Sequence, residues 1–105
     1  MSDLDKLIDD VWAGGTLPRP LPFPAYQAAY VIGAYDGSLD AALALHKALL
    51  PGWSVTLEND DGNIHAAVWP RGEIGEQHGA EGPTPALALL LAILRAYRQQ
   101  RGSEE

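Results

Sequence analysis

Cysteine is absent from the 105 residues of this chain, which excludes disulfide scaffolds, thiol catalysis and cysteine-based zinc sites. Basic residues are scarce as well: 7 Lys and Arg stand against 14 Asp and Glu, so the formal net charge is −7. This balance argues against a protein that wraps nucleic acid or lies on an anionic membrane, because the long-range field repels both.

Long hydrophobic runs are also missing. The longest, Ala86 to Leu94, is shorter than the ~18 residues of a membrane-spanning helix. The acidic opening, Met1 to Asp5, lacks the basic-then-apolar order of a signal peptide. We therefore expect a cytoplasmic protein, and its length allows one small domain.

The N-terminal part of the chain divides into two segments. Residues 1–15 predict an amphipathic helix, because apolar residues recur there with helical spacing and Gly14 and Gly15 follow as a stop: Leu4, Leu7, Ile8, Val11 and Trp12. Residues 16–24 contain four prolines, which exclude a helix or a central strand and predict a stiff connector.

Residues 25–101 are predicted to form the core of the domain, and residues 102–105 a frayed tail. The β-branched and aromatic run around Tyr30 to Ile32 favours a short strand. A helix from Leu39 to Leu50 is predicted with Ser38 as its N-cap. The last helix is predicted to start at Pro85 with Thr84 as its N-cap, and to be buried almost all round.

Two strands around residues 59–62 predict a β-hairpin. Apolar and polar residues alternate from Trp53 to Glu58 and from Asn63 to Trp69, and Gly62 suits the turn between them. The alternation places five residues on the core side: Val55, Leu57, Ile64, Ala66 and Val68. The glycine-rich segment from Arg71 to Gly82 is predicted to be a loop.

The fold class that follows is α+β: a small antiparallel sheet with a central β-hairpin, covered by helices in a helix–sheet–helix sandwich. Ala67 and Trp69 make part of the far face of this sheet apolar. We expect the N-terminal helix to cover that face, in its own chain or exchanged with a second copy in a homo-oligomer.

No motif of established chemistry emerges from the sequence. The histidines lack the spacing of a metal site, and His46, on an apolar helical face, is expected to be a buried core residue. The nearest approach to an acid–base group is His78 with Glu73, Glu76 and Glu81 in the predicted loop. We therefore expect no enzyme, no metal and no cofactor.

One stretch of the chain resembles a known family. Tyr35-Asp36-Gly37-Ser38-Leu39-Asp40-Ala41-Ala42-Leu43 resembles a signature of the phage ABA-sandwich domain family, small proteins of phages and prophages. Trp53, the strand ending at Trp69, and Thr84-Pro85 match in order, so the resemblance spans roughly residues 35 to 98. It implies a helix–sheet–helix sandwich in a bacterial host cell. It carries over no catalytic residue.

Two functional hypotheses remain. The first is a non-enzymatic phage or prophage accessory protein that binds an unidentified protein partner. Its candidate interaction surface combines aromatic, small and basic residues: Trp69, Ala67, Trp12, Arg95 and Arg98. Complementation of the helix C-terminus is the first explanation for the arginines, and a contact with a phosphate or an acidic partner is the alternative. The second hypothesis is an acidic decoy that inhibits a nucleic-acid-binding host defence enzyme, which requires the acidic residues to form one row.

Overall fold

The computed structural model describes residues 3–14, 17, 21, 23–60, 63–70 and 78–104. Within them, four helices and one three-stranded antiparallel sheet confirm the α+β class. The elements follow one another as α1 (Asp3–Ala13), α2 (Ala25–Tyr35), α3 (Leu39–Leu49), β1 (Ser54–Asp60), β2 (Asn63–Trp69), β3 (His78–Gly82) and α4 (Pro85–Glu104). Most of the proline-rich connector lies outside the described residues.

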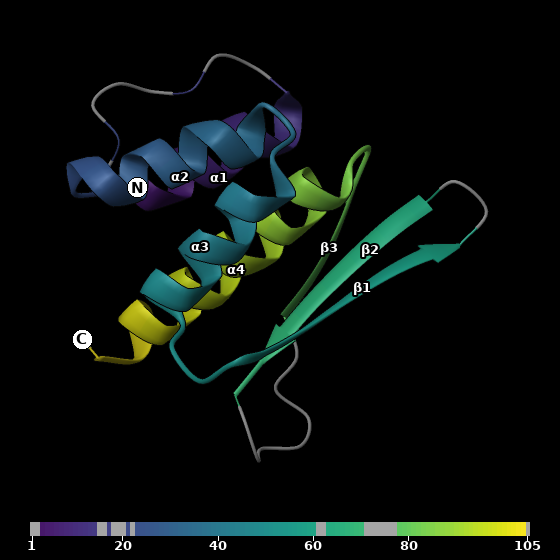
Figure 1. Cartoon of the computed structure of the whole chain (residues 1–105). Helices are drawn as coiled ribbons and strands as arrows, with labels where there is room; N and C mark the ends of the chain where they lie inside the picture. Colours follow the sequence, from purple (N-terminus) through teal and green to yellow (C-terminus); the bar gives the residue numbers. More distant parts are fainter. Residues whose placement is uncertain are drawn as a thin grey trace.

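The helices lie on one side of the sheet, and α4 is the element that packs on it (Figure 1). Helix α4 contacts β2 and β3 on one side and α1, α2 and α3 on the other. Its residues Ala88 to Leu94 and Ala96 are all buried. A helix that is apolar all round belongs at the centre of a fold, and here it joins the sheet to the other helices.

The predicted N-caps of α3 and α4 are confirmed. The Ala41 backbone N–H donates to Ser38 Oγ at 3.2 Å, and the Leu87 backbone N–H donates to Thr84 Oγ1 at 3.1 Å. Each bond satisfies one of the N–H groups that the first turn of a helix leaves unpaired. Helix α4 runs to Glu104, so it includes residues predicted as a frayed tail.

The hairpin pairs in the predicted register. Val55 lies opposite Val68 and Leu57 opposite Ala66, so the five predicted core-side residues share one face of the sheet. Ala66 and Val68 are buried beneath α4. Leu57 is 37% exposed, because β1 is the edge strand farther from α4. The prediction that Leu57 is a buried core leucine is therefore wrong.

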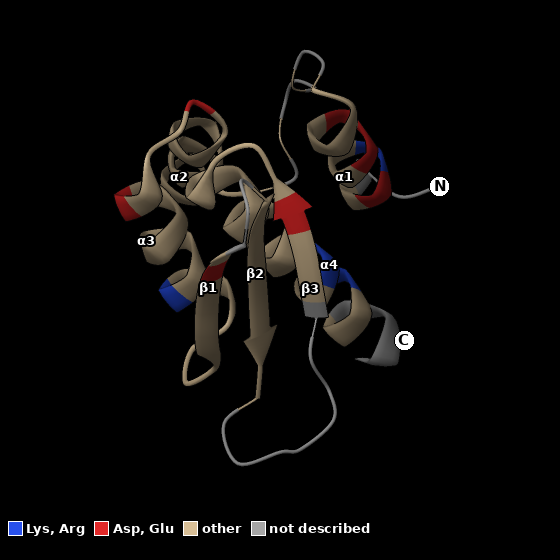
Figure 2. Cartoon of the chain, turned by 90° about the vertical axis from the view of Figure 1, so that its right-hand side faces the viewer, with Lys and Arg blue, Asp and Glu red and all other residues tan. Residues whose placement is uncertain are grey.

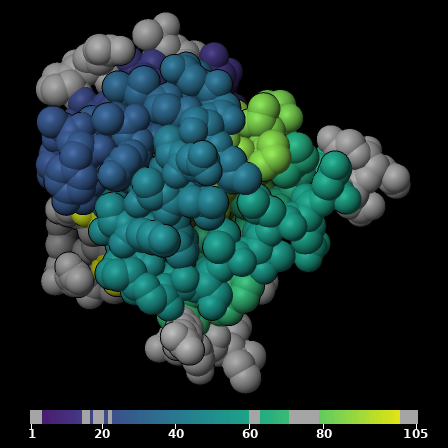
Figure 3. Space-filling model, viewed as in Figure 1, coloured from purple at the N-terminus to yellow at the C-terminus, as the bar shows by residue number. Residues whose placement is uncertain are grey.

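Two predicted elements differ in the structure. The strand predicted at Tyr30 to Ile32 is wrong, since these residues belong to α2. The loop predicted from Arg71 to Gly82 is also wrong at its end, where β3 pairs antiparallel with β2. Residues 71–77 lie outside the described part of the chain. Figure 3 shows α2, α3 and β1 forming one continuous surface.

Helix α1 confirms the predicted amphipathic helix, but it packs in a different place. Its residues Leu4, Leu7, Ile8 and Val11 are buried, and its packing partner is α4. Figure 2 shows α1 beside the β3 edge of the sheet, not across the sheet face. The prediction that this helix covers the far face within its own chain is therefore wrong, and that face is open along the described strands.

Candidate functional site

The candidate site centres on the exposed indole of Trp12. It lies in the last turn of α1 and is 63% exposed, although the helical pattern predicted that it would be buried. The Arg95 guanidinium of α4 lies over the Trp12 ring, with Cζ 5.3 Å from the ring centroid. Such a cation–π contact contributes about 0.5–1 kcal/mol at an exposed site. The indole is thus held in position while its surface faces solvent.

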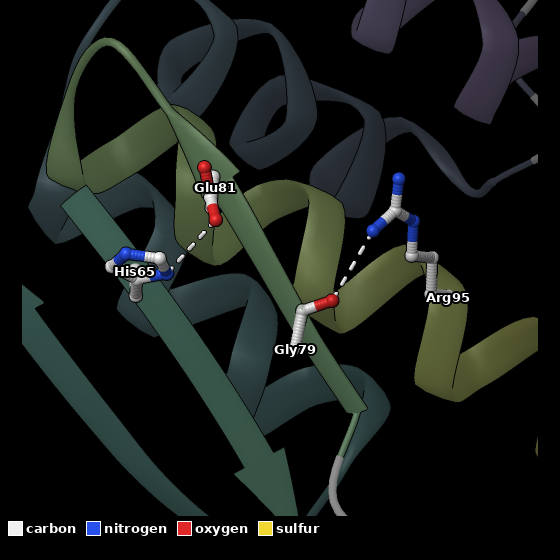
Figure 4. Close-up of polar contacts among 4 residues, drawn as sticks. All are labelled: His65, Gly79, Glu81 and Arg95. Carbon is white, nitrogen blue, oxygen red and sulfur yellow. Dashed lines mark hydrogen bonds and ion pairs between the residues drawn. The ribbon is translucent and has the colours of Figure 1, made fainter. Parts of the chain in front are cut away.

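Arg95 also ties α4 to the edge of the sheet. Its Nη1 donates to the Gly79 carbonyl oxygen of β3 at 3.2 Å (Figure 4). One turn later, Arg98 Nη1 donates to Asp5 Oδ1 of α1 at 3.0 Å. The two arginines therefore connect α4 with β3 and with both ends of α1. The positions of both arginine side chains are therefore explained by contacts with neighbouring elements as well as by complementation of the helix C-terminus.

Two depressions meet at Trp12 and Glu81. One, of about 500 Å³, is lined by small residues and by the charged groups of the sheet edge: Trp12, His65, Ala66, Ala67, Gly79, Ala80, Glu81 and Arg95. The other, of about 320 Å³, is lined by both apolar and polar residues: Trp12, Asn63, Ile64, Glu81, Gly82, Pro83, Leu87 and Leu91. We call the two depressions with their shared rim the Trp12 surface.

Glycine at position 82 permits the geometry of this surface. A Cβ atom there would lie 2.8 Å from the Ala88 backbone nitrogen, closer than real Cβ atoms approach. The absence of a side chain lets the end of β3 lie against the first turns of α4. The smaller depression lies where these two elements meet.

The open sheet face carries a polar pair beside the larger depression. His65 Nδ1 lies 3.3 Å from Glu81 Oε1, across the β2–β3 pairing (Figure 4). Histidine–carboxylate pairs also occur in acid–base catalysis. Here the side chains are 42% and 58% exposed on an open face. Water therefore surrounds the pair, whereas catalytic electrostatics gain most in a site that excludes water.

The predicted interaction residues divide into two groups. The structure brings Trp12, Arg95 and Ala67 together at one depression, with Arg98 in the next turn of α4. Trp69 shares the open face but lies near the other end of β2, opposite Ser54. Gly79 and Leu87 were missed, because they belong to the segment interpreted as a loop and to the interior of the last helix. Glu81 was named, but in an acid–base group with His78 rather than in the interaction surface.

Metal binding and acid–base catalysis are the other kinds of chemistry to consider in the described chain. No group of three His, Asp or Glu side chains within it is placed to hold a metal ion. Glu73, Glu76 and the side chain of His78 lie outside the described residues, so the acid–base hypothesis for them stays a prediction. No helix in this part of the chain is long and apolar enough to cross a membrane.

Comparison with models of known families, with curated proteins and with solved structures finds no match to this chain. The resemblance to the phage ABA-sandwich family therefore stays a prediction, and the function has to be inferred from the residues themselves.

His46 is a buried polar side chain of α3. It is buried in α3, as predicted, and its Nε2 makes no hydrogen bond within the described part of the chain. Burial lowers the pKa of His46 below its ordinary value of 6.5, and the neighbouring charge of Lys47 lowers it further. The neutral imidazole is thus the form that the fold accommodates.

This buried histidine predicts a pH-dependent stability. The unfolded chain takes up the proton near pH 6.5, before the folded chain does, so the free energy of unfolding should fall as the pH drops through and below 6.5. Urea unfolding at several pH values will measure the decline. His46→Leu should flatten it. Lys47→Ala should leave most of it, because burial is the larger cause. An unchanged decline in His46→Leu would contradict this assignment.

Proposed function

We propose that this chain is a non-enzymatic accessory protein of a phage or prophage that acts by binding another protein. The resemblance of residues 35 to 98 supports the phage origin. The Trp12 surface supports the binding function. The single observation that carries the proposal is the placement of Trp12, which contacts Arg95, is 63% exposed and is shared by two adjoining depressions.

The physical case rests on how aromatic anchors contribute to interfaces. Tryptophan brings a large rigid surface to a contact, and binding costs little entropy when the ring is already held in place. Residues that dominate binding energy are enriched in Trp and Arg and cluster beside pockets. Trp12 and Arg95 form such a pair. Most other large apolar side chains of α1 and α4 are buried, so the exposure of Trp12 is selective.

The acidic-decoy hypothesis is less well supported. Figure 2 shows the described acidic residues on α1, at the turn between α2 and α3, at the start of α3, on β1 and at the end of β3. A mimic of the nucleic-acid backbone needs closely spaced charges in one row. The acidic residues of this chain are spread over several elements, which favours a role in solubility. The Trp12 surface then remains the proposed contact region.

The test is photo-crosslinking from the proposed surface in the bacterial host. A benzophenone amino acid replaces Trp12 in the full chain, and in a matched protein it replaces Tyr26. Tyr26 is equally prominent, 60% exposed, but lies on α2. Irradiation should give a specific product from position 12 and none from position 26. Equal products from both positions, no product from position 12, or a product with the mass of two copies of this chain would contradict the proposal.

A further inference from the structure

The charges on the Trp12 surface indicate the chemistry of its partner. Both arginines already have partners in the protein: Arg95 contacts the Trp12 ring and the Gly79 carbonyl, and Arg98 contacts Asp5. Glu81 lines both depressions, and 58% of its side chain is exposed. A carboxylate has about four acceptor sites in its two oxygens, so the His65 contact leaves capacity for a second donor. Glu81 is the charged residue in the lining of the smaller depression, whereas Arg95 lines the larger one, so a partner's charge at the smaller depression meets a carboxylate.

Asp9 adds a second carboxylate on the side of α1 that carries Trp12. Asp9 is exposed on α1, three residues before Trp12 and so on the same side of the helix. The chain as a whole carries a formal charge of −7. Both features attract a cationic partner and repel an anionic one during approach.

The apolar side chains in the lining of the smaller depression set a second requirement. Ile64, Leu87 and Leu91 line it, with Trp12 at its rim. A site of about 320 Å³ with this lining favours an aliphatic or aromatic side chain. Because Glu81 borders the same depression, the apolar side chain and the cation of the partner must be close together along its chain.

Side chains rather than backbone pairing should carry the contact. An edge strand can accept a further strand from a partner through its unpaired carbonyl and N–H groups. On β3, the Gly79 carbonyl already accepts the Arg95 hydrogen bond. A strand added there would have to displace Arg95 and disturb its contact with Trp12.

We infer that the Trp12 surface recognises a basic segment of its protein partner, in which an apolar side chain fills the depression beside Leu87 and an adjacent Lys or Arg pairs with Glu81. This inference rests on the proposed function and adds the partner's chemistry to it. It makes Glu81 the residue that determines specificity and Trp12 the anchor.

Selection from a phage-displayed library of random peptides will test the inference without assuming the answer. The full chain is the bait, and peptides that also bind Trp12→Ala are discarded. The retained peptides should share an apolar residue next to Lys or Arg. Retained peptides with an acidic consensus, or with no charge preference, would overturn the inference while leaving binding at Trp12, and hence the proposed function, in place.

The most enriched peptide then provides a probe for Glu81. Glu81→Gln should weaken its binding about fivefold, the value of a partly exposed ion pair. Glu58→Gln makes the same chemical change on the open sheet face, but on β1 and outside both depressions. It should change binding less than about twofold. Equal weakening by the two variants would show attraction to net charge alone and overturn the inference.

Two further outcomes separate the inference from the proposed function. If no peptide depends on Trp12 and no crosslink forms from position 12, both fail together. If wild-type protein is a dimer in sedimentation and Trp12→Ala is a monomer, a second copy occupies the surface, and the basic segment is overturned.

Discussion

Replacing Leu89 with alanine should lower the free energy of unfolding by about 2–5 kcal/mol, the range for a fully buried leucine. Leu89 has no exposed surface and lies in the central helix, α4. That helix contacts two strands and three helices. The cavity would therefore open in the one layer that joins the sheet to the other helices, where neighbours have little freedom to collapse into it.

Leu57→Ala is the matched control, since it removes the same atoms from a leucine that is 37% exposed. It should cost less than about 1 kcal/mol, because a side chain that retains much of its contact with water gains little from burial. Urea unfolding followed by circular dichroism will give both values. Equal losses from the two variants would show that burial beneath α4 does not govern stability.

The contrast between these two leucines shows how far the sequence predicts this fold. Periodicity identified α1, α3, α4 and both strands of the hairpin, because alternating or helical spacing of apolar residues records which side faces a core. It also placed Leu57 on the correct face. It could not show that β1 extends beyond the area that α4 covers, since coverage depends on tertiary packing rather than on local pattern.

Helix α2 shows a different limit. Tyr30, Val31 and Ile32 favour a strand by propensity, yet α2 packs against α3 and buries Val31 and Ala34. A Cβ atom at Gly33 would lie 2.9 Å from the Cβ atom of Ala41. The glycine thus permits the close approach of the two helices, and this packing overrides the local preference.

Strand β3 was missed for a related reason. His78-Gly79-Ala80-Glu81-Gly82 contains two glycines and has little strand propensity. Small residues are needed there because α4 approaches closely, as the position of Gly82 shows. The same error assigned Glu81 to an acid–base group in a predicted loop and not to the interaction surface. Trp12 and Arg95 were recognisable from residue type, but the groove they share with β3 depends on where α1 docks.

The docking of α1 is the basis of the second large effect. Leu7→Asp should lower the free energy of unfolding by more than about 3 kcal/mol, because it places an unpaired carboxylate in an apolar interior. Leu7 is fully buried, and α1 packs on α4. The folded chain can avoid the penalty only by releasing α1, which would expose the apolar residues of α4 that it covers.

Ala13→Asp provides the control, since it introduces the same charge in the same helix at an exposed position. It should change stability by less than about 1 kcal/mol, mainly through an unfavourable charge near the helix C-terminus. Urea unfolding will compare the two variants, and tryptophan fluorescence will report whether Trp12 keeps its contact with Arg95.

Near-equal stability of Leu7→Asp and Ala13→Asp would mean that α1 does not dock on α4 in solution. The Trp12 surface would then lose its fixed indole, and with it the pre-organisation on which partner binding is argued. A large loss of unfolding free energy in Leu7→Asp alone would show that the hydrophobic packing of α1 holds the Trp12 surface in place.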